Sequence, residues 1–201
     1  MEPRAESRTE RKKEETLSKI ITVSVDLFNR YGIDAVTMEQ IAEEADIARG
    51  TLYNYLPSKE AIINAYLQRT FRQHGDERLA QIRQLPDTRA RLTHIFSLLV
   101  SGVQAQKQIF EAFMVYRMKQ VLSFRPVEGE QTSLAALIHE IISRGQQEGD
   151  LRTDLPAGLL AELFEFALIE AIKPFYLDPE HYDPHLSIEQ AVDLFLHGAK
   201  A

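Results

Sequence analysis

The residues best suited to specific chemistry lie between positions 48 and 59, and that chemistry is hydrogen bonding to nucleic acid. Arg49, Thr51 and Asn54 are spaced so that they share one face of a short helix. Arginine can bond O6 and N7 of guanine, and asparagine can bond N6 and N7 of adenine. Gly50 has no side chain, which permits either another backbone segment or a phosphate to approach the helix backbone closely. A solvated polar helix face is the alternative interpretation.

Two helices and a short turn are expected to position these side chains. The pattern predicts a helix over 38–45, a turn at Asp46 and Ile47, and a second helix over 48–55. Thr37 stands at the N-cap of the first helix, with Gln40 at the capping-box position. The second helix begins at an alanine, which cannot cap, and Asp46 is a candidate to supply the missing oxygen. This layout is typical of a helix-turn-helix that places its second helix in the major groove of DNA.

The rest of the chain also carries a helical pattern. Apolar spacing predicts a helix over 17–31 that ends at Gly32, and a long helix from Lys59 to about Gln84 with Ser58 as its N-cap. Further amphipathic stretches bring the total to roughly nine helices, and no alternating strand pattern of useful length occurs. The sequence therefore predicts an all-α fold.

The N-terminal motifs resemble those of the TetR family of bacterial transcriptional regulators. The matching stretches are Phe28-Asn29-Arg30-Tyr31-Gly32, Thr37-Met38-Glu39-Gln40-Ile41-Ala42, Gly50-Thr51-Leu52-Tyr53-Asn54-Tyr55-Leu56 and Ser58-Lys59-Glu60. A later string, Gly145 to Arg152, resembles a turn that many members share. The resemblance implies that Thr37, Tyr53, Tyr55 and Lys59 contact phosphates, which fixes register without reading sequence. For Tyr53, a place in the core is the alternative.

Composition limits the other possibilities. The chain has 201 residues, 44% of them hydrophobic, a net charge of −7 and no cysteine, which excludes disulfides and thiolate metal sites. No apolar run approaches the roughly 18 residues that span a bilayer, so a cytoplasmic location is expected. We predict a charged tail over 1–15 that is disordered or a frayed entry to a helix, a DNA-binding domain over 16–62, and a regulatory and dimerisation domain over 63–201.

No catalytic, cofactor or metal site is predicted. Glycine-rich phosphate loops, nucleophile elbows and isolated carboxylate pairs are all missing from the sequence. His181 and His185 are spaced for a metal, but Pro184 lies between them and no companion ligand follows.

A homodimer is predicted on two grounds. Helix-turn-helix proteins of this kind read two half-sites of an operator, and the segment 159–175 is apolar on nearly every face. A helix apolar all round must be buried all round, here against a second copy, although a monomeric core is the alternative. Together with the last helix, the expected interface is Leu160, Phe164, Leu168, Ile172, Ile188, Val192 and Phe195.

The family resemblance also implies a small-molecule effector that binds in the larger domain. Aromatic and flexible apolar residues are dense there, so an apolar or amphipathic effector is expected. The candidate pocket residues are Phe96, Phe110, Phe113, Met114, Arg117, His139 and Phe166. The resulting hypothesis is a dimeric repressor that its effector releases from a palindromic operator. The alternatives are an architectural or division-linked DNA-binding protein without effector sensing, and a protein-interaction module.

Overall fold

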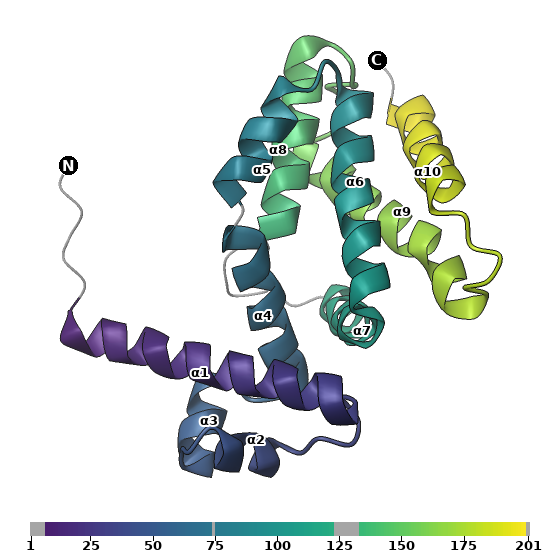
Figure 1. Cartoon of the computed structure of the whole chain (residues 1–201). Helices are drawn as coiled ribbons and strands as arrows, with labels where there is room; N and C mark the ends of the chain where they lie inside the picture. Colours follow the sequence, from purple (N-terminus) through teal and green to yellow (C-terminus); the bar gives the residue numbers. More distant parts are fainter. Residues whose placement is uncertain (1–6, 74, 123–132, 200–201) are drawn as a thin grey trace. The chain divides into compact units, whose positions relative to one another are not determined.

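A computed structural model describes residues 7–73, 75–122 and 133–199. Within these residues the chain forms ten α-helices (Figure 1). Their bounds are α1 Arg8–Tyr31, α2 Met38–Glu44, α3 Arg49–Tyr55, α4 Lys59–Gln73, α5 Gly75–Gln84, α6 Thr88–Ala105, α7 Lys107–Leu122, α8 Ser133–Glu148, α9 Ala157–Leu177 and α10 Pro184–Ala199. The predicted all-α fold is confirmed.

The first helix is longer than the sequence pattern predicted. It begins at Arg8, within the tail that was expected to be either disordered or a frayed entry to a helix, and the second of these agrees with the structure. The Ser7 hydroxyl accepts a hydrogen bond from the Glu10 backbone N–H at 3.2 Å, and the Glu10 carboxylate accepts from the Ser7 N–H at 2.8 Å. This reciprocal capping box satisfies two free donors and starts a helix in a polar sequence. At the other end, Gly32 adopts φ 83° as predicted for a glycine that closes a helix.

The predicted helix over 59–84 is two helices in the structure. It is divided into α4, which ends at Gln73, and α5, which begins at Gly75. Glycine costs a helix interior only about 1 kcal/mol relative to alanine, so its presence in the sequence did not by itself predict a break.

The described residues form two compact units, which differ from the predicted domains. Residues 7–69 and 108–122 belong to one unit, and residues 70–73, 75–107 and 133–199 belong to the other. The predicted boundary after residue 62 therefore falls seven residues early, and most of α7 joins the N-terminal unit. Both α4 and α7 contribute residues to each unit.

The N-terminal unit is organised around aliphatic side chains that several helices share. Ile20 of α1, Ile41 of α2, Leu52 of α3 and Ile62 of α4 are fully buried. In Figure 1, α2 and α3 lie together against α1, in agreement with the packing of α1 on α2 and of α2 on α3. Burial of one face of α3 leaves its other face free for contact with a ligand.

The second unit is a helical bundle in which α8 and α10 pack on α9, and α10 and α8 pack on α6. A buried arginine, Arg91, ties the start of α6 to the end of α8 through an ion pair with Glu148. Its guanidinium also donates to the Leu85 carbonyl at 3.1 Å. Thr88 donates its hydroxyl proton to the Asp150 carboxylate at 2.8 Å. The string from Gly145 to Arg152 therefore anchors α8 to α6.

The hydrogen bond from Arg91, followed by that from Arg144, holds the pKa of Glu148 below its ordinary value. A carboxylate with a lowered folded-state pKa stabilises the fold at neutral pH. This contribution is lost as the pH falls through the lowered pKa, so the α6–α8 connection is expected to weaken in acid.

We expect Gly145→Ala to lower the free energy of unfolding by about 1–3 kcal/mol because a Cβ there overlaps its neighbours. The added atom would lie 2.7 Å from the Thr88 hydroxyl oxygen and 2.9 Å from a Leu151 methyl carbon. Urea unfolding followed by circular dichroism measures the change. Gly158→Ala on α9 is the matched control, since nothing lies within 4 Å of its added Cβ. Equal stability of the two variants would contradict this account.

Candidate nucleic-acid interface

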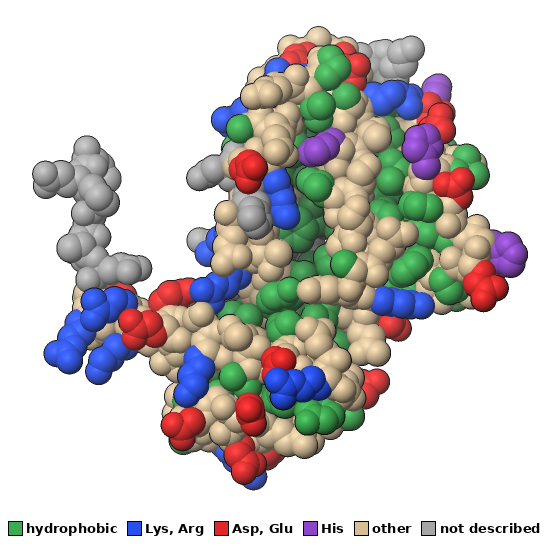
Figure 2. Space-filling model, in the orientation of Figure 1, with side chains coloured by type: hydrophobic (Ala, Val, Ile, Leu, Met, Phe, Trp, Pro, Cys, Tyr) green, Lys and Arg blue, Asp and Glu red, His purple; other side chains and the backbone are tan. Residues whose placement is uncertain are grey.

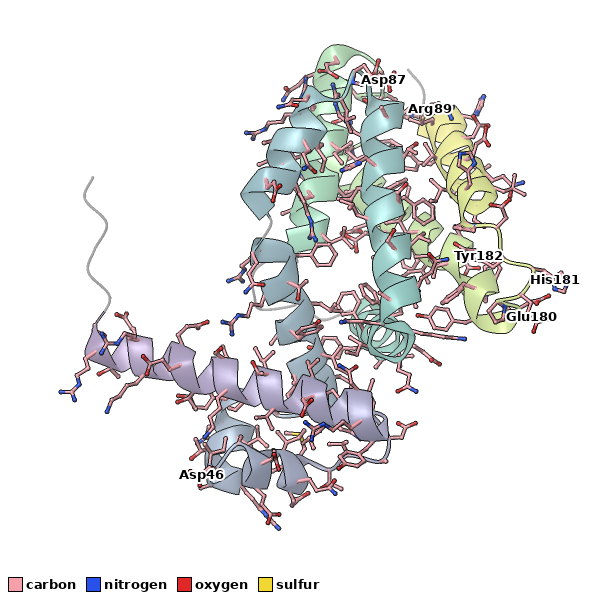
Figure 3. All side chains as sticks on the ribbon, in the orientation of Figure 1. Asp46, Asp87, Arg89, Glu180, His181 and Tyr182 are labelled. Atoms are coloured by element: carbon pink, nitrogen blue, oxygen red, sulfur yellow. The ribbon has the colours of Figure 1, made fainter. Side chains whose placement is uncertain are left out.

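The turn between α2 and α3 depends on Asp46, which adopts φ 52° (Figure 3). Aspartate tolerates this left-handed conformation better than most residues. The Ile47 N–H then donates to the Ala42 carbonyl at 3.0 Å, which closes the turn. The expectation that Asp46 caps α3 was wrong, because Ala48 is the N-cap residue and no side chain caps that helix. Asp46 therefore sets the direction of α3 through its backbone.

The outer face of α3 carries the polar side chains that the sequence singled out. Arg49 and Asn54 are exposed, Thr51 is half-buried, and Leu52 is fully buried on the opposite side. Tyr53 is 45% exposed, which disfavours the alternative that it is a core aromatic. A short helix fixed by its apolar face and polar on its outer face suits insertion into a groove.

Gly50 lies on this outer face, with nothing within 4 Å of the position that a Cβ would occupy. No close approach inside the protein therefore requires a glycine here. If the missing side chain matters, the group that approaches must be an external one, such as a DNA phosphate.

Thr37 and Tyr55 flank the recognition helix in different ways. The exposed Thr37 caps α2: its hydroxyl accepts from the Gln40 N–H at 3.2 Å, and Gln40 accepts from the Thr37 N–H at 2.8 Å. This confirms the predicted capping box. Tyr55 ends α3 and is half-buried. Their roles toward phosphate stay predictions.

Lys59 has a structural role that the sequence did not indicate. Its ammonium donates to the carbonyl of Ile33 at 2.6 Å and to that of Val36 at 2.9 Å. Two of its three donors therefore hold the α1–α2 connection against the first turn of α4. One N–H remains for a phosphate. Ser58, as predicted, caps α4 by accepting from the Ala61 N–H at 3.2 Å.

Acidic residues lie close to the candidate interface. Arg49 is 3.8 Å from the Glu39 carboxylate of α2, a loose and exposed pair. Figure 2 shows acidic and basic side chains intermixed over the surface of α1 to α3. Such a pair contributes little to stability, but it competes with DNA for the guanidinium. The pairing of Glu39 with Arg49 is not readable from the sequence, because it depends on how α2 and α3 lie in space.

Comparisons with known proteins identify this region. Residues 20–66 match the family model described as bacterial regulatory proteins, tetR family. This part of the chain belongs to the TetR family. It is 33% identical over 101 residues to the transcriptional repressor KstR of Rhodococcus jostii, covering 49% of this chain and 45% of that protein. It is 24% identical over 148 residues to KstR2 of Mycobacterium tuberculosis, covering 71% and 72% of the two proteins.

A solved TetR-family structure has the same fold over almost the whole chain. It is FadR of Thermus thermophilus in complex with lauroyl-CoA, with 23% identity, a TM-score of 0.74, and coverage of 90% of this chain and 94% of that one. The alignment with KstR spans less than half of that protein's length, whereas this structural match extends through the second unit.

The predicted pocket residues are distributed over both units. Phe96, His139 and Phe166 belong to the second unit, whereas Phe110, Phe113 and Met114 belong to the first. Phe96 and Phe110 are buried, Phe113, Met114 and His139 are half-buried, and Phe166 is 38% exposed. The Arg117 side chain lies outside the described residues. A shared effector site for these residues stays a prediction.

The predicted dimer-interface residues lie mostly in the chain's own core. Leu160, Phe164, Leu168 and Ile172 of α9 are at most 2% exposed. On α10, Ile188 is 8% exposed and Val192 is fully buried, and Phe195 is half-buried with its ring 5.0 Å from that of Phe164. Buried side chains cannot offer a surface to a partner. The outward face of α9 is a different one, and it carries Leu159, Leu163 and Phe166.

His181 and His185, the two histidines with metal-ligand spacing, are not part of a metal site among the described residues. His181 is exposed and 3.0 Å from Asp178 (Figure 3). Among the described residues, no group of three or more potential ligands is close enough to hold a metal ion. None of the described helices is long and apolar enough to cross a membrane.

Gly50→Ala should stabilise the fold by about 0.5–1 kcal/mol, as expected for alanine in a helix. It should also weaken DNA binding by about tenfold, since the methyl group blocks a phosphate or base edge. Urea unfolding and fluorescence anisotropy with a bound duplex measure the two effects. Gly158→Ala should reproduce the first effect without the second. A Gly50→Ala variant with unchanged DNA affinity would remove Gly50 from the interface.

Glu39→Gln should raise DNA affinity by about two- to fivefold at low salt, because Arg49 loses its competing partner. The gain should shrink as salt screens the exposed charges. Anisotropy titrations over a salt series test this, with Glu14→Gln on α1 as the control. A variant that binds DNA no better than the control would mean that the pair is irrelevant to binding.

Proposed function

We propose that the chain is a dimeric, ligand-responsive transcriptional repressor of the bacterial cytoplasm. The observation that carries the proposal is the outer face of α3, where Arg49, Tyr53 and Asn54 are exposed on a helix anchored by the buried Leu52. In this proposal Arg49 and Asn54 contact base edges, whereas Thr37, Tyr53 and Lys59 contact phosphates. Two copies would read a palindromic operator with half-sites about 34–36 Å apart or a multiple of it.

The proposed dimer uses the exposed apolar face of α9 and α10. Leu159, Leu163 and Phe166 recur on one stripe of α9, and Leu186 and Leu194 on one stripe of α10. Hydrophobic side chains also reach the surface over these two helices in Figure 2. Two such helices from each copy would form a four-helix interface around a two-fold axis.

The proposed effector is an amphipathic molecule with an anionic end. Two buried atoms of the second unit, Arg78 Nη1 on α5 and His94 Nε2 on α6, have no hydrogen-bond partner among the described residues. Arg78 and His94 are equally far from Pro86 along the chain, one on each side, so the α5–α6 hairpin brings them to a similar level. A buried polar atom without a hydrogen-bond partner destabilises the fold unless a ligand or water supplies the partner.

An anionic group is the natural partner for this cation. Burial lowers the pKa of the Arg78 guanidinium, whose carbon lies 5.0 Å from the centre of the Phe71 ring. The FadR proteins of Thermus thermophilus and Bacillus subtilis, which share the fold, are described with lauroyl-CoA and stearoyl-CoA respectively. We therefore propose an acyl chain with a carboxylate or phosphate-bearing end.

Effector binding would act on DNA affinity through α4, because that helix contributes to both units. In the proposed mechanism, effector binding displaces α4 and changes the separation of the two recognition helices. A coupling of about 1–3 kcal/mol would weaken operator binding by 5–150-fold.

Selection from a random-sequence duplex library, followed by competition with lauroyl-CoA, tests the function. The proposal predicts enrichment of a palindrome with two half-sites, and release of the protein by lauroyl-CoA. Arg78→Met should bind the same DNA but respond less to lauroyl-CoA, whereas Arg83→Met, on the exposed side of α5, should respond normally. Dispersed sequences without a palindrome and without any response would support the architectural alternative. A protein that bound no DNA at all would support the other alternative, a protein-interaction module.

Leu163→Glu should weaken dimerisation by at least about 100-fold, because it buries a carboxylate in an apolar interface. Val115→Glu is the matched control, since Val115 and Leu163 are both 49% exposed and Val115 lies in the other unit. Sedimentation velocity with circular dichroism reports association and folding together. A folded Leu163→Glu variant that remains dimeric would place the interface elsewhere.

A further inference from the structure

Glu39 of α2 and Arg49 of α3 form an exposed ion pair between the two helices of the helix-turn-helix. Arg49 Nη1 lies 3.8 Å from Glu39 Oε1, and the two side chains are 70% and 43% exposed respectively. The helices that carry them pack on each other within one compact unit and lie side by side in Figure 1. A molecule in solution can therefore reach both members of the pair.

The pair is expected to add little to the stability of the fold. Exposed ion pairs stabilise folded proteins only weakly, and a separation of 3.8 Å is loose. A carboxylate in the first turn of α2 is favourable for the dipole of that helix, but the dipole does not require an arginine beside it. A negative charge next to DNA also repels the phosphates. A role in selecting DNA explains the pairing better than a role in folding.

The structure of α3 by itself does not direct the Arg49 side chain. Arg49 is the first residue of α3, and no side chain caps that helix. A long, exposed arginine has many rotamers, and it can bond whichever phosphate is nearest. Contacts with phosphate carry no sequence information. Another group therefore has to orient the guanidinium if Arg49 is to read a base.

The Glu39 carboxylate can supply this orientation. It faces Nη1, one of the three guanidinium nitrogens, and leaves the N–H groups of Nε and Nη2 unused by the pair. These two groups point the same way along one edge of the planar guanidinium, which suits a bidentate contact with O6 and N7 of guanine. The carboxylate also repels phosphates, so it disfavours the nonspecific contacts that its neighbour would otherwise make.

We propose that Glu39 is a positioning residue for base recognition, which directs Arg49 toward a guanine and keeps its guanidinium away from the phosphates. Glu39 stays paired with Nη1, while Nε and Nη2 donate to O6 and N7 of one guanine in each half-site. The pair thereby lowers the affinity for arbitrary DNA and raises the preference for the operator. This inference rests on the proposed function, because it specifies how the α3 face reads its operator.

Anisotropy with the operator obtained from the library selection tests the preference. The measured quantity is the affinity for the operator divided by the affinity for a duplex in which one G·C pair of each half-site is replaced by A·T. At the guanine that Arg49 reads, Arg49→Met should lower this ratio by roughly 5- to 150-fold, the range for one bidentate contact. Glu39→Gln should lower it by about two- to fivefold, because the freed guanidinium binds the substituted duplex better.

Glu43→Gln is the matched control, since Glu43 is an exposed carboxylate of the same helix and the variant removes the same charge. It should leave the ratio unchanged. In an Arg49→Met background, Glu39→Gln should have no further effect on the ratio. A further loss in that background would mean that Glu39 contacts a base directly, which would overturn the positioning role. Equal losses in the Glu39 and Glu43 variants would also overturn it.

A measurement without DNA separates this inference from the proposed function. Relaxation of ¹⁵N in the Arg49 Nε–H group of the free protein reports how strongly the guanidinium is restrained. Glu39→Gln should make this group more mobile, and Glu43→Gln should not. Unchanged mobility in Glu39→Gln would overturn the inference even if an operator is found. A wild type that selects no operator would defeat the proposed function, and the base recognition with it.

Discussion

The candidate DNA face depends on the partly buried ammonium of one lysine side chain. The Lys59 ammonium joins two carbonyl oxygens of the α1–α2 connection to the first turn of α4. Charge-assisted hydrogen bonds of this kind are stronger than neutral ones, and they satisfy carbonyls that no helix uses. The connection leads directly into Thr37 and α2. The turn at Asp46 follows α2 and sets the direction of α3. A cation expected only to contact phosphate therefore also positions the elements that present Arg49 and Asn54.

The second unit has a different constraint: α9 carries apolar side chains on two of its faces. One face of α9 is the bundle core, with Phe164 and Leu168 buried inside the chain. The other face leaves Leu163 and Phe166 exposed. An exposed apolar stripe of this kind marks a surface that a partner covers. In the proposed function two half-sites of an operator are read at once, which makes a second copy the proposed partner. The bundle and the proposed interface are thus opposite sides of the same helix.

Local signals in the sequence predicted most of the fold. Contacts between residues that are distant in the chain could not be predicted from it. The capping box at Thr37, the glycine that ends α1 and the apolar spacing of α6 to α10 each act within a few residues, and the structure confirms them. The Ser7 capping box has the same local signature, a serine followed three residues later by a glutamate, but it lies in a charged stretch that favours disorder. The contacts of Lys59 with Ile33 and of Arg49 with Glu39 required helices to be placed in space. A helix that is apolar on nearly every face does not reveal which face is core, and the α9 residues predicted for the interface lie on its buried side.

The most direct test of this account is hydrogen exchange of Lys59→Met combined with its DNA affinity as a function of salt. If Lys59 positions the interface, the backbone amides from Val36 to Gln40 exchange faster in the variant while the remaining helices stay protected. DNA affinity then falls by about tenfold or more, beyond one lost contact. If Lys59 only touches phosphate, exchange is unchanged and the salt dependence loses about one counterion. That second result would contradict the account.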